Sequence, residues 1–183
     1  MRGRYGIAPG TLLIGCIGRM HPQKAQEYLI RAYRRLRQAG HDVALMLVGG
    51  GDTLPAMRVE AEGITPPVIF AGEVTGQGYN DLMAAFDLYA QPSRFEGLPR
   101  TLLDAMYLRR PIVATAVNGN CDAIRDGENG LLVPSEDDAA LAAALERLIA
   151  DPGLRDRLAV QAAEDARRNF SMEQQLGRIE GLL

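Results

Sequence analysis

The feature that most constrains the fold is the alternation of short apolar runs with longer stretches of helical periodicity along most of the chain. The runs are apolar at nearly every position, which is typical of strands buried on both faces of a parallel sheet. These runs are Leu12–Ile17, Val43–Val48, 68–70, Leu88–Gln91, Ile112–Thr115 and Leu131–Val133. Because parallel strands need crossover connections, the sequence predicts a doubly wound α/β sheet of six mainly parallel strands.

The helical stretches carry their own start signals. In Gln26–Gln38, apolar residues recur three and four positions apart and form one buried stripe. Three helices close the chain: one begins at Ser135, with Asp138 three positions later as in a capping box, and one has Pro152 at its first helical position. The last is predicted over 171–183. No linker or repeat interrupts the pattern, so all 183 residues are predicted to form one domain with C-terminal helices.

Composition excludes several classes of protein. Hydrophobic residues make up 47% of the chain, which is enough for one core. The net charge of −3 argues against a nucleic-acid partner, because such domains carry an excess of Lys and Arg. No apolar run is long enough for a transmembrane segment, and the first ten residues lack the apolar stretch of a signal peptide. Cys16 and Cys121 are too far apart in sequence for a CxxC motif and indicate reduced thiols, so we expect a cytoplasmic protein.

Familiar nucleotide-binding and hydrolase motifs are missing. The segment after the first run reads IGCIGRMHPQK and lacks GxGxxG, and neither a P-loop nor GxSxG occurs in the chain. His21 and His41 stand apart from any cysteine or acidic pair at metal-ligand spacing, which favours surface or loop positions. The sequence therefore predicts neither a bound dinucleotide nor a bound metal.

The segment 91–111, QPSRFEGLPRTLLDAMYLRRP, could carry chemistry at the carboxyl end of a strand, where α/β sheets bind ligands. After the run Leu88–Gln91 it passes a turn containing Glu96 and enters a helix that contains Asp104. N–H groups at a helix start suit phosphate, because they lack intrahelical acceptors and lie at the positive end of the helix dipole. The turn offers those of Gly97, Leu98, Arg100 and Thr101. Taken singly, each acid could instead be a solvated surface residue.

Two cations are expected at the same edge of the sheet. Arg19 and Lys24 follow the first run, in GRMHPQK. With the helix-start N–H groups they would form a diphosphate clamp, since hydrogen bonds between charged groups are among the stronger ones. The alternative for each cation is a solvated surface position. The glycines at 49–51 either let another loop approach the ligand closely or form an ordinary turn.

These segments resemble a known family. Six landmarks occur in order: IGCIGRMHPQK, LMLVGGGD, VIFAGEV, FDLYAQPSRFEGLPRTLLDAM, RRPIVAT and DGENGLLVP. From Ile14 to the last helix they resemble the C-terminal, nucleotide-sugar-binding domain of family 4 (group 1) retaining glycosyltransferases of the GT-B fold. The resemblance implies a Rossmann-like domain that is one half of a GT-B fold, with the acceptor-binding half preceding it and absent from this chain.

The resemblance also implies roles for individual residues. Arg19 and Lys24 match the family's phosphate-binding cations, and Glu96 matches the first acid of its E-x7-E motif, which contacts the donor sugar. These three are the predicted catalytic residues. Asp104 matches the second acid, which holds the ribose hydroxyls, and Val74 in AGEV matches the residue that borders the base. The predicted substrate-binding set also includes Gly18, Gly97, Leu98, Arg100 and Thr101.

Two positions depart from the family's pattern. Asp104 stands where a second Glu is usual, which shortens the side chain by about 1.5 Å, so we expect a weaker or water-bridged ribose contact. Ala25 stands where a glycine usually follows the lysine, which predicts an ordinary backbone conformation at that position.

The implied activity is retaining transfer of a sugar from a UDP- or GDP-linked donor to a glycan or lipid-linked acceptor, as in polysaccharide biosynthesis, with no metal or other cofactor. Arg19, Lys24 and the helix-start N–H groups would stabilise the leaving diphosphate. The helix over 171–183 would cross onto the absent half. The isolated chain is therefore expected to bind nucleotide without turnover, and to be able to self-associate through the surface left exposed.

The sequence is also compatible with other classes of function. The chain could be a non-catalytic nucleotide-sugar-binding module or regulatory subunit, whereas a sugar-nucleotide epimerase of the same architecture lacks support in the motifs. For a full-length enzyme, the inner face of a membrane is an alternative to a purely cytoplasmic location.

Overall fold

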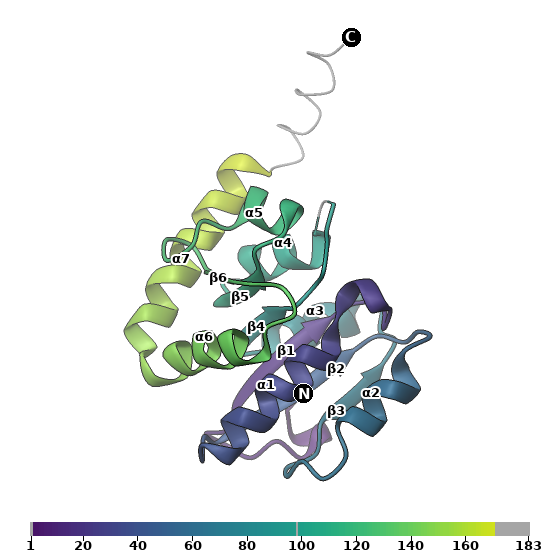
Figure 1. Cartoon of the computed structure of the whole chain (residues 1–183). Helices are drawn as coiled ribbons and strands as arrows, with labels where there is room; N and C mark the ends of the chain where they lie inside the picture. The colour runs from purple at the N-terminus through teal and green to yellow at the C-terminus, as the bar shows by residue number, and fades with distance from the viewer. Residues whose placement is uncertain (1, 98, 171–183) are drawn as a thin grey trace.

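A computed structural model of the chain describes residues 2–97 and 99–170 (Figure 1). Its six strands form one sheet in the order β3-β2-β1-β4-β5-β6, with all neighbouring strands parallel. The strands are β1 (Leu12–Ile17), β2 (Val43–Val48), β3 (Ile69–Gly72), β4 (Leu88–Gln91), β5 (Ile112–Thr115) and β6 (Leu131–Val133). The predicted doubly wound α/β class is confirmed. The strand order reverses between β1 and β4, and such a switch point is where open α/β sheets bind ligands.

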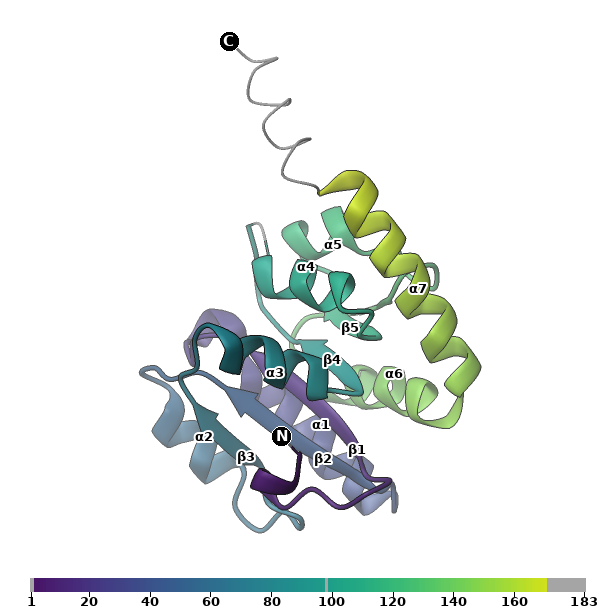
Figure 2. The same ribbon diagram turned by 180° about the vertical axis from the view of Figure 1, so that it is seen from behind.

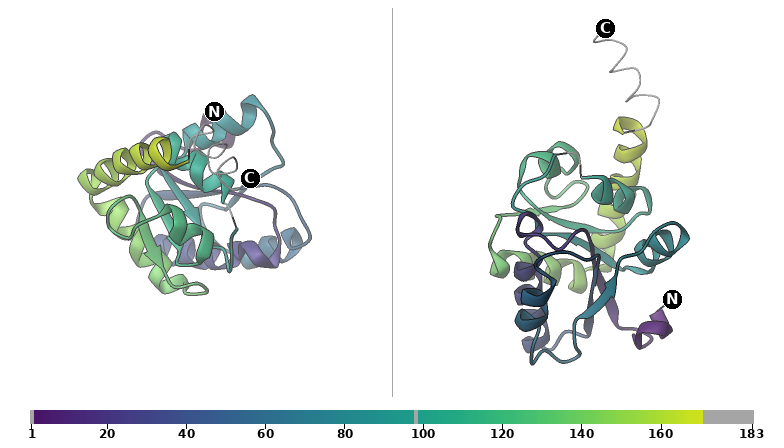
Figure 3. Two further views of the ribbon diagram at one scale, coloured as in Figure 1. Left: turned by 90° about the horizontal axis from the view of Figure 1, so that it is seen from above. Right: turned by 90° about the vertical axis from the view of Figure 1, so that its right-hand side faces the viewer.

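Helices cover both faces of the sheet, as the views in Figures 2 and 3 show. One face carries α1 (Gln26–Gln38), α2 (Leu54–Glu60) and α6 (Asp138–Ala150), and the other carries α3 (Gln77–Ala85), α4 (Arg100–Tyr107) and α5 (Asn118–Ala123). The long helix α7 (Pro152–Asn169) joins both layers, because Leu158 packs in the first core and Ala162 in the second. Two short 3-10 helices, η1 (Arg2–Tyr5) and η2 (Pro22–Lys24), precede β1 and α1.

The continuous apolar character of the strands follows from this two-sided covering. In β2, Leu45 and Leu47 point into the core under α1, whereas Met46 and Val48 point into the core under α3. All six residues of β2 are buried. A strand covered on both faces has no solvated side on which polar residues could alternate, which is why the runs lack alternation.

Two details differ from the sequence-based expectations, and two predicted features fall outside the described residues. The third strand is Ile69–Gly72 rather than 68–70, because its register with β2 shifts between Leu47 and Val48 and pairing continues to Gly72. The helix expected to begin at Ser135 begins later, because Asp137 is its N-cap and accepts a hydrogen bond from the Ala140 N–H at 2.8 Å. The predicted start of α7 at Pro152 is confirmed. The helix predicted over 171–183 lies outside the described residues, as does Leu98.

Candidate functional site

The loops that follow β1 and β2 pack against each other at the carboxyl edge of the sheet. A Cβ atom on Gly49 would lie 2.2 Å from the Gly18 carbonyl oxygen, and one on Gly51 would lie 2.3 Å from that of Met20. Both glycines also have positive φ, at +133° and +145°. Only glycine fits these two positions, because the approach and the backbone conformation each exclude a side chain. The turn at 49–51 is therefore a specific glycine turn that lets the loop after β1 pack closely against it.

A cavity of about 540 Å³ lies at the ends of β1, β2 and β3, and we call it the cleft. Three of the predicted site residues line it, namely Gly18, Arg19 and Val74. The rest of its lining consists of Ile17, Val48, Gly49, Gly50, Gly51, Glu73, Thr75 and Tyr79. The bare backbone of the glycines forms one wall, so a ligand could reach the ends of the strands directly.

Arg19 is the cation that lines this cleft. Its guanidinium lies 3.1 Å from Oδ2 of Asp52, and the two side chains are 67% and 74% exposed. An ion pair this exposed contributes only about 0–1 kcal/mol, so little opposes a turn of Arg19 toward an anion in the cleft.

Lys24 and Glu96 form a second, far more buried ion pair. The Nζ atom of Lys24 lies 2.7 Å and 2.9 Å from the two carboxylate oxygens of Glu96, and the Glu96 side chain is only 5% exposed. Oε1 of Glu96 also accepts hydrogen bonds from Ser93 Oγ at 2.5 Å and Gln91 Nε2 at 3.2 Å. Glu96 is thus not a solvated loop acid. Lys24 is also the only lysine in a chain that otherwise uses arginine for its cations.

The two cations lie on one loop, but each already has an acidic partner. Gly18 links them, because it lines the cleft together with Arg19 and also lines a very small cavity shared with Lys24 and Glu96. The predicted clamp is therefore two neighbouring ion pairs at the end of β1. A diphosphate would have to compete with Asp52 and Glu96 for them.

The backbone at Ala25 is not ordinary, so that expectation is wrong. Ala25 has φ 51° and ψ 35°, in the left-handed region. The cause is local, because Ala25 is at once the last residue after η2 and the cap of α1, and the chain must turn between these helices at one residue. Ala25 therefore adopts the left-handed conformation that glycine favours, although it carries a side chain.

Asp104 meets the cleft through Tyr79. The Tyr79 hydroxyl donates to Oδ2 of Asp104 at 2.5 Å and so joins α3 to α4. Burial raises the pKa of Tyr79 above its usual range, and the hydrogen bond to Asp104 raises it further, so Tyr79 keeps its proton and remains a donor. Asp104 therefore has one oxygen held by tyrosine at the rim of the cleft.

The start of α4 brings the remaining predicted donors to the edge of the sheet. Pro99 is the N-cap and makes no side-chain capping hydrogen bond, so the N–H groups of Arg100 and Thr101 belong to an uncapped first turn. The Thr101 hydroxyl accepts from the Tyr89 hydroxyl at 2.9 Å. Gly97, just before this turn, is exposed.

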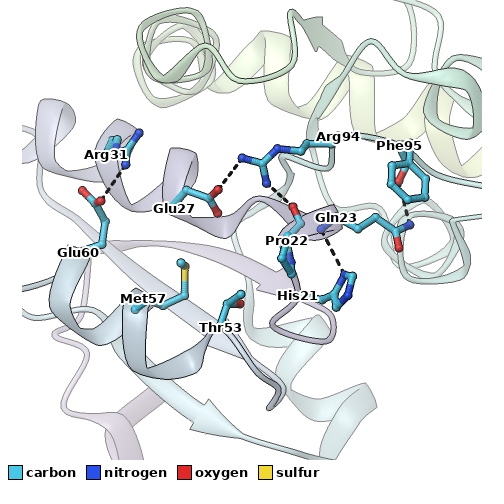
Figure 4. Close-up of a pocket in the computed structure, with 11 residues that line it drawn as sticks. His21, Pro22, Gln23, Glu27, Arg31, Thr53, Met57, Glu60, Arg94 and Phe95 are labelled. Carbon is cyan, nitrogen blue, oxygen red and sulfur yellow. Dashed lines mark hydrogen bonds and ion pairs between the residues drawn. The ribbon is translucent and has the colours of Figure 1, made fainter.

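A second cavity, of about 590 Å³, lies on the other side of the β1–α1 loop, between α1 and α2 (Figure 4). Its charged side chains pair with one another, as Arg94 does with Glu27 at 2.8 Å and Arg31 with Glu60 at 2.9 Å. The two arginines and two glutamates that line this cavity therefore balance in charge. The charges that line the cleft, Arg19 and Glu73, balance as well, so the cleft differs from this cavity in its wall of bare glycine backbone.

The two histidines make structural contacts, and the two cysteines are unpaired. His21 caps η2 by accepting from the Gln23 N–H at 3.3 Å, and His41 lies 2.8 Å from Glu146 at the surface. Cys16 is buried and Cys121 exposed, and neither forms a disulfide. Within residues 2–97 and 99–170, no group of three or more His, Cys, Asp or Glu side chains could hold a metal ion. No helix in the described part of the chain is long and apolar enough to cross a membrane.

Sequence reasoning missed the residues that hold the acids in place. Tyr79 was not singled out, and neither were Gln91 and Ser93, although both lie in the QPSRFEG segment. A signal was present, because a glutamine at the end of an otherwise apolar strand must find buried partners. Which partners it finds depends on contacts between elements far apart in sequence.

Comparisons with known proteins show the family and the fold. Residues 11–151 match the family described as "Glycosyl transferases group 1". Alpha-D-kanosaminyltransferase from Streptomyces kanamyceticus is 32% identical over 184 residues, which is 100% of this chain and 47% of that protein. D-inositol 3-phosphate glycosyltransferase from Salinispora arenicola is 35% identical over 193 residues, or 100% of this chain and 42% of that protein. The crystal structure of Anabaena HepE in complex with UDP and glucose has a TM-score of 0.88 and 27% identity, covering 100% of this chain and 51% of that one.

The fold and the site together define a Rossmann-like domain of the type found in GT-B glycosyltransferases. The family match over residues 11–151 takes this one step further: the chain belongs to the group 1 glycosyltransferases. It spans about half the length of the curated relatives it matches, at 47% and 42% of the two named above. The family and the fold class predicted from the sequence are both confirmed.

Proposed function

We propose that this chain is the donor-binding half of a retaining glycosyltransferase that transfers a sugar from a nucleoside diphosphate sugar to an acceptor. The observation that carries the proposal is the cleft at the ends of β1, β2 and β3, which a cation and bare glycine backbone line together. The complex of the similar protein HepE with UDP and glucose supports the choice of ligand class.

In this proposal the diphosphate lies between the β1–α1 loop and the start of α4. Arg19 turns from Asp52 to the diphosphate, Lys24 contributes its charge from the pair with Glu96, and the N–H groups of Arg100 and Thr101 donate from an uncapped helix start. Positive groups fixed in place before reaction stabilise the negative charge that develops on the leaving diphosphate, without a metal ion.

The acids would contact different parts of the same donor. Glu96 orients the sugar, Asp104 accepts hydrogen bonds from the ribose, and Val74 borders the base from the wall of the cleft. The family's usual account of retention is attack on the same face as the departing diphosphate. In that account Glu96 does not become covalently attached to the sugar. A partner domain completes the active site by binding the acceptor, which is a glycan or a lipid-linked molecule.

Calorimetry with UDP, GDP and ADP tests the binding step. At least one diphosphate should bind, and Arg19→Ala should weaken it by about 1.5–3 kcal/mol, the size of a hydrogen bond to a charged group. Arg147→Ala is the matched control, because Arg147 is exposed on α6 away from the cleft and should leave the affinity unchanged. Equal affinity of the Arg19→Ala variant and the unchanged chain would refute the role of Arg19.

A transfer assay separates an enzyme from a binding module. The assay uses a chain that also carries an acceptor-binding half, supplied with the diphosphate sugar of the base that binds. Transfer with retention at the anomeric carbon, unaffected by a chelator, is the expected result. Tight binding without transfer to any acceptor would favour the non-catalytic module.

A further inference from the structure

Five buried polar residues form a closed hydrogen-bonded ring behind Glu96. Gln91 Nε2 donates to Glu96 Oε1 at 3.2 Å and to Asn120 Oδ1 at 2.9 Å. Asn120 Nδ2 donates to Thr115 Oγ1 at 3.3 Å, and that hydroxyl donates to the Ser93 carbonyl at 2.5 Å. Ser93 Oγ closes the ring on Glu96 Oε1 at 2.5 Å. All five residues are buried, so water does not replace these partners when one is lost.

Gln91 connects this ring to the start of α4. Besides its two donor bonds, its Oε1 accepts from the Thr101 hydroxyl at 3.3 Å. One amide group at the end of β4 therefore touches the acid of the predicted sugar site, the first turn of α4 and the helix α5. Gln91 is 4% exposed and every polar group of its side chain has a partner.

The helix α5 also contacts the backbone of the turn that carries Glu96. The Gly119 N–H, next to Asn120, donates to the Glu96 carbonyl at 3.2 Å. A Cβ on Gly119 would lie 1.7 Å from the Gly97 carbonyl oxygen, so α5 is in direct contact with the turn that carries Glu96. The helix α5 thus holds the Glu96 side chain through Gln91, and it binds the Glu96 backbone directly.

We propose that Gln91 is a positioning residue that acts through Glu96. Its amide holds the Glu96 carboxylate against Lys24 and ties that carboxylate to the first turn of α4 through Thr101. The inference rests on the proposed function, because its consequence is that the sugar-binding acid and the diphosphate-binding helix start move as one unit. Gln91 itself touches neither ligand, since Glu96 and Thr101 stand between.

Binding of UDP-glucose provides the first test. Gln91→Met keeps the length of the side chain and removes its polar bonds, and should weaken UDP-glucose about tenfold, the equivalent of one or two hydrogen bonds. In a Glu96→Ala background the same substitution should change the affinity less than about twofold, because the group it acts through is gone. A merely structural defect would weaken binding equally in both backgrounds, and that result would overturn the proposal.

Lys24 provides a second test that needs no ligand. Because Lys24 is the only lysine, acetylation by acetic anhydride can be read on a single tryptic peptide by mass spectrometry. Gln91→Met should speed its acetylation at least about threefold, since a loosened carboxylate protects the ammonium less. If the unchanged chain binds no UDP-glucose, the proposed function fails for that donor. The acetylation rate of Lys24 still tests the role of Gln91 in that case.

Two further variants complete the experiment. Asn129→Leu removes a buried amide from a separate cluster with Asp165 and should lower the melting temperature without changing either readout. Asn120→Ala removes the partner that holds the Gln91 amide and should shift both readouts in the same direction as Gln91→Met. It replaces Gln91→Met if that variant does not fold. An unchanged acetylation rate in both Gln91→Met and Asn120→Ala would overturn the proposal.

Discussion

The Tyr79 hydroxyl lies 2.5 Å from Oδ2 of Asp104 and holds this carboxylate at the rim of the cleft. Asp104 is shorter than the glutamate expected at this position, and Tyr79 fixes one of its two oxygens. Tyr79→Phe removes the hydroxyl and keeps the ring. We expect the affinity for UDP to fall about fivefold, because the loss of one hydrogen bond leaves the carboxylate less well oriented. Calorimetry measures the change.

Tyr28→Phe is the matched control for this substitution. The Tyr28 hydroxyl lies on α1, 3.4 Å from Glu136 and away from the cleft, so its removal should leave UDP affinity unchanged. Equal affinities of the Tyr79→Phe and Tyr28→Phe variants would show that Tyr79 does not orient Asp104 for binding.

The contact between α5 and the Glu96 turn predicts a steep cost for any side chain at Gly119. Gly119→Ala places a methyl group 1.7 Å from the Gly97 carbonyl oxygen, so the turn must move. We expect a loss of about 2–3 kcal/mol in the free energy of unfolding, as for other overpacked sites, and weaker nucleotide binding as well. Urea denaturation measures the first effect and calorimetry the second.

Gly78→Ala tests whether the cost at Gly119 is specific. Gly78 lies in α3 without a positive φ, and a Cβ atom added there would meet nothing within 4 Å. Alanine there should raise stability by up to about 1 kcal/mol, because glycine is a poor helix residue. A Gly119→Ala variant as stable as the unchanged chain would contradict the close approach of α5.

Much of the fold could be predicted from the sequence, because the strands are short apolar runs that alternate with stretches of helical periodicity. Five strands have the predicted bounds, and the exception is β3, where a register shift with β2 depends on the partner strand. Local patterns do not encode such shifts. The same holds for α6, where two aspartates and a serine compete for the N-cap and Asp137 takes it.

The candidate site could be predicted only in part. Strand ends brought Arg19, Lys24 and Glu96 to one edge, since parallel strands share their carboxyl side. The partners of these residues could not be read from the chain. The pairing of Lys24 with Glu96 joins positions 72 residues apart, and that of Tyr79 with Asp104 joins two different helices. Such contacts follow from packing and not from local spacing.

The left-handed backbone at Ala25 predicts a gain in stability on substitution by glycine. An L-residue in this region costs about 1–2 kcal/mol. Glycine removes that strain but loses about 0.4–1 kcal/mol through the entropy of the unfolded chain, so the net gain should be about 0.5 kcal/mol. Ala32→Gly, in the middle of α1, is the control and should lose about 1 kcal/mol. Urea denaturation of both variants should give shifts of opposite sign, and a loss at both positions would show that packing of the buried Ala25 methyl group outweighs the backbone strain.

Cys16 should be inert toward thiol reagents while the chain is folded. Burial raises the pKa of Cys16 from 9.0 to about 12, the Glu96 charge supports this shift, and the Lys24 charge opposes it. Since only the thiolate reacts readily, iodoacetamide at about pH 8 should modify the exposed Cys121 and leave Cys16 intact until urea unfolds the chain. A Cys121→Ser variant should then take up no label when folded.

The raised pKa of Cys16 also determines the direction in which pH changes the stability of the fold. Above pH 9.0 the unfolded chain releases the Cys16 proton, whereas the folded chain keeps it until the pH approaches about 12. The folded state therefore binds more protons in this window, and the free energy of unfolding should fall as the pH rises through it. Below pH 9.0 this group should contribute no slope. Cys16→Ala should make the alkaline loss shallower in urea denaturation between about pH 8 and 11, and an identical slope in both chains would show that Cys16 titrates normally.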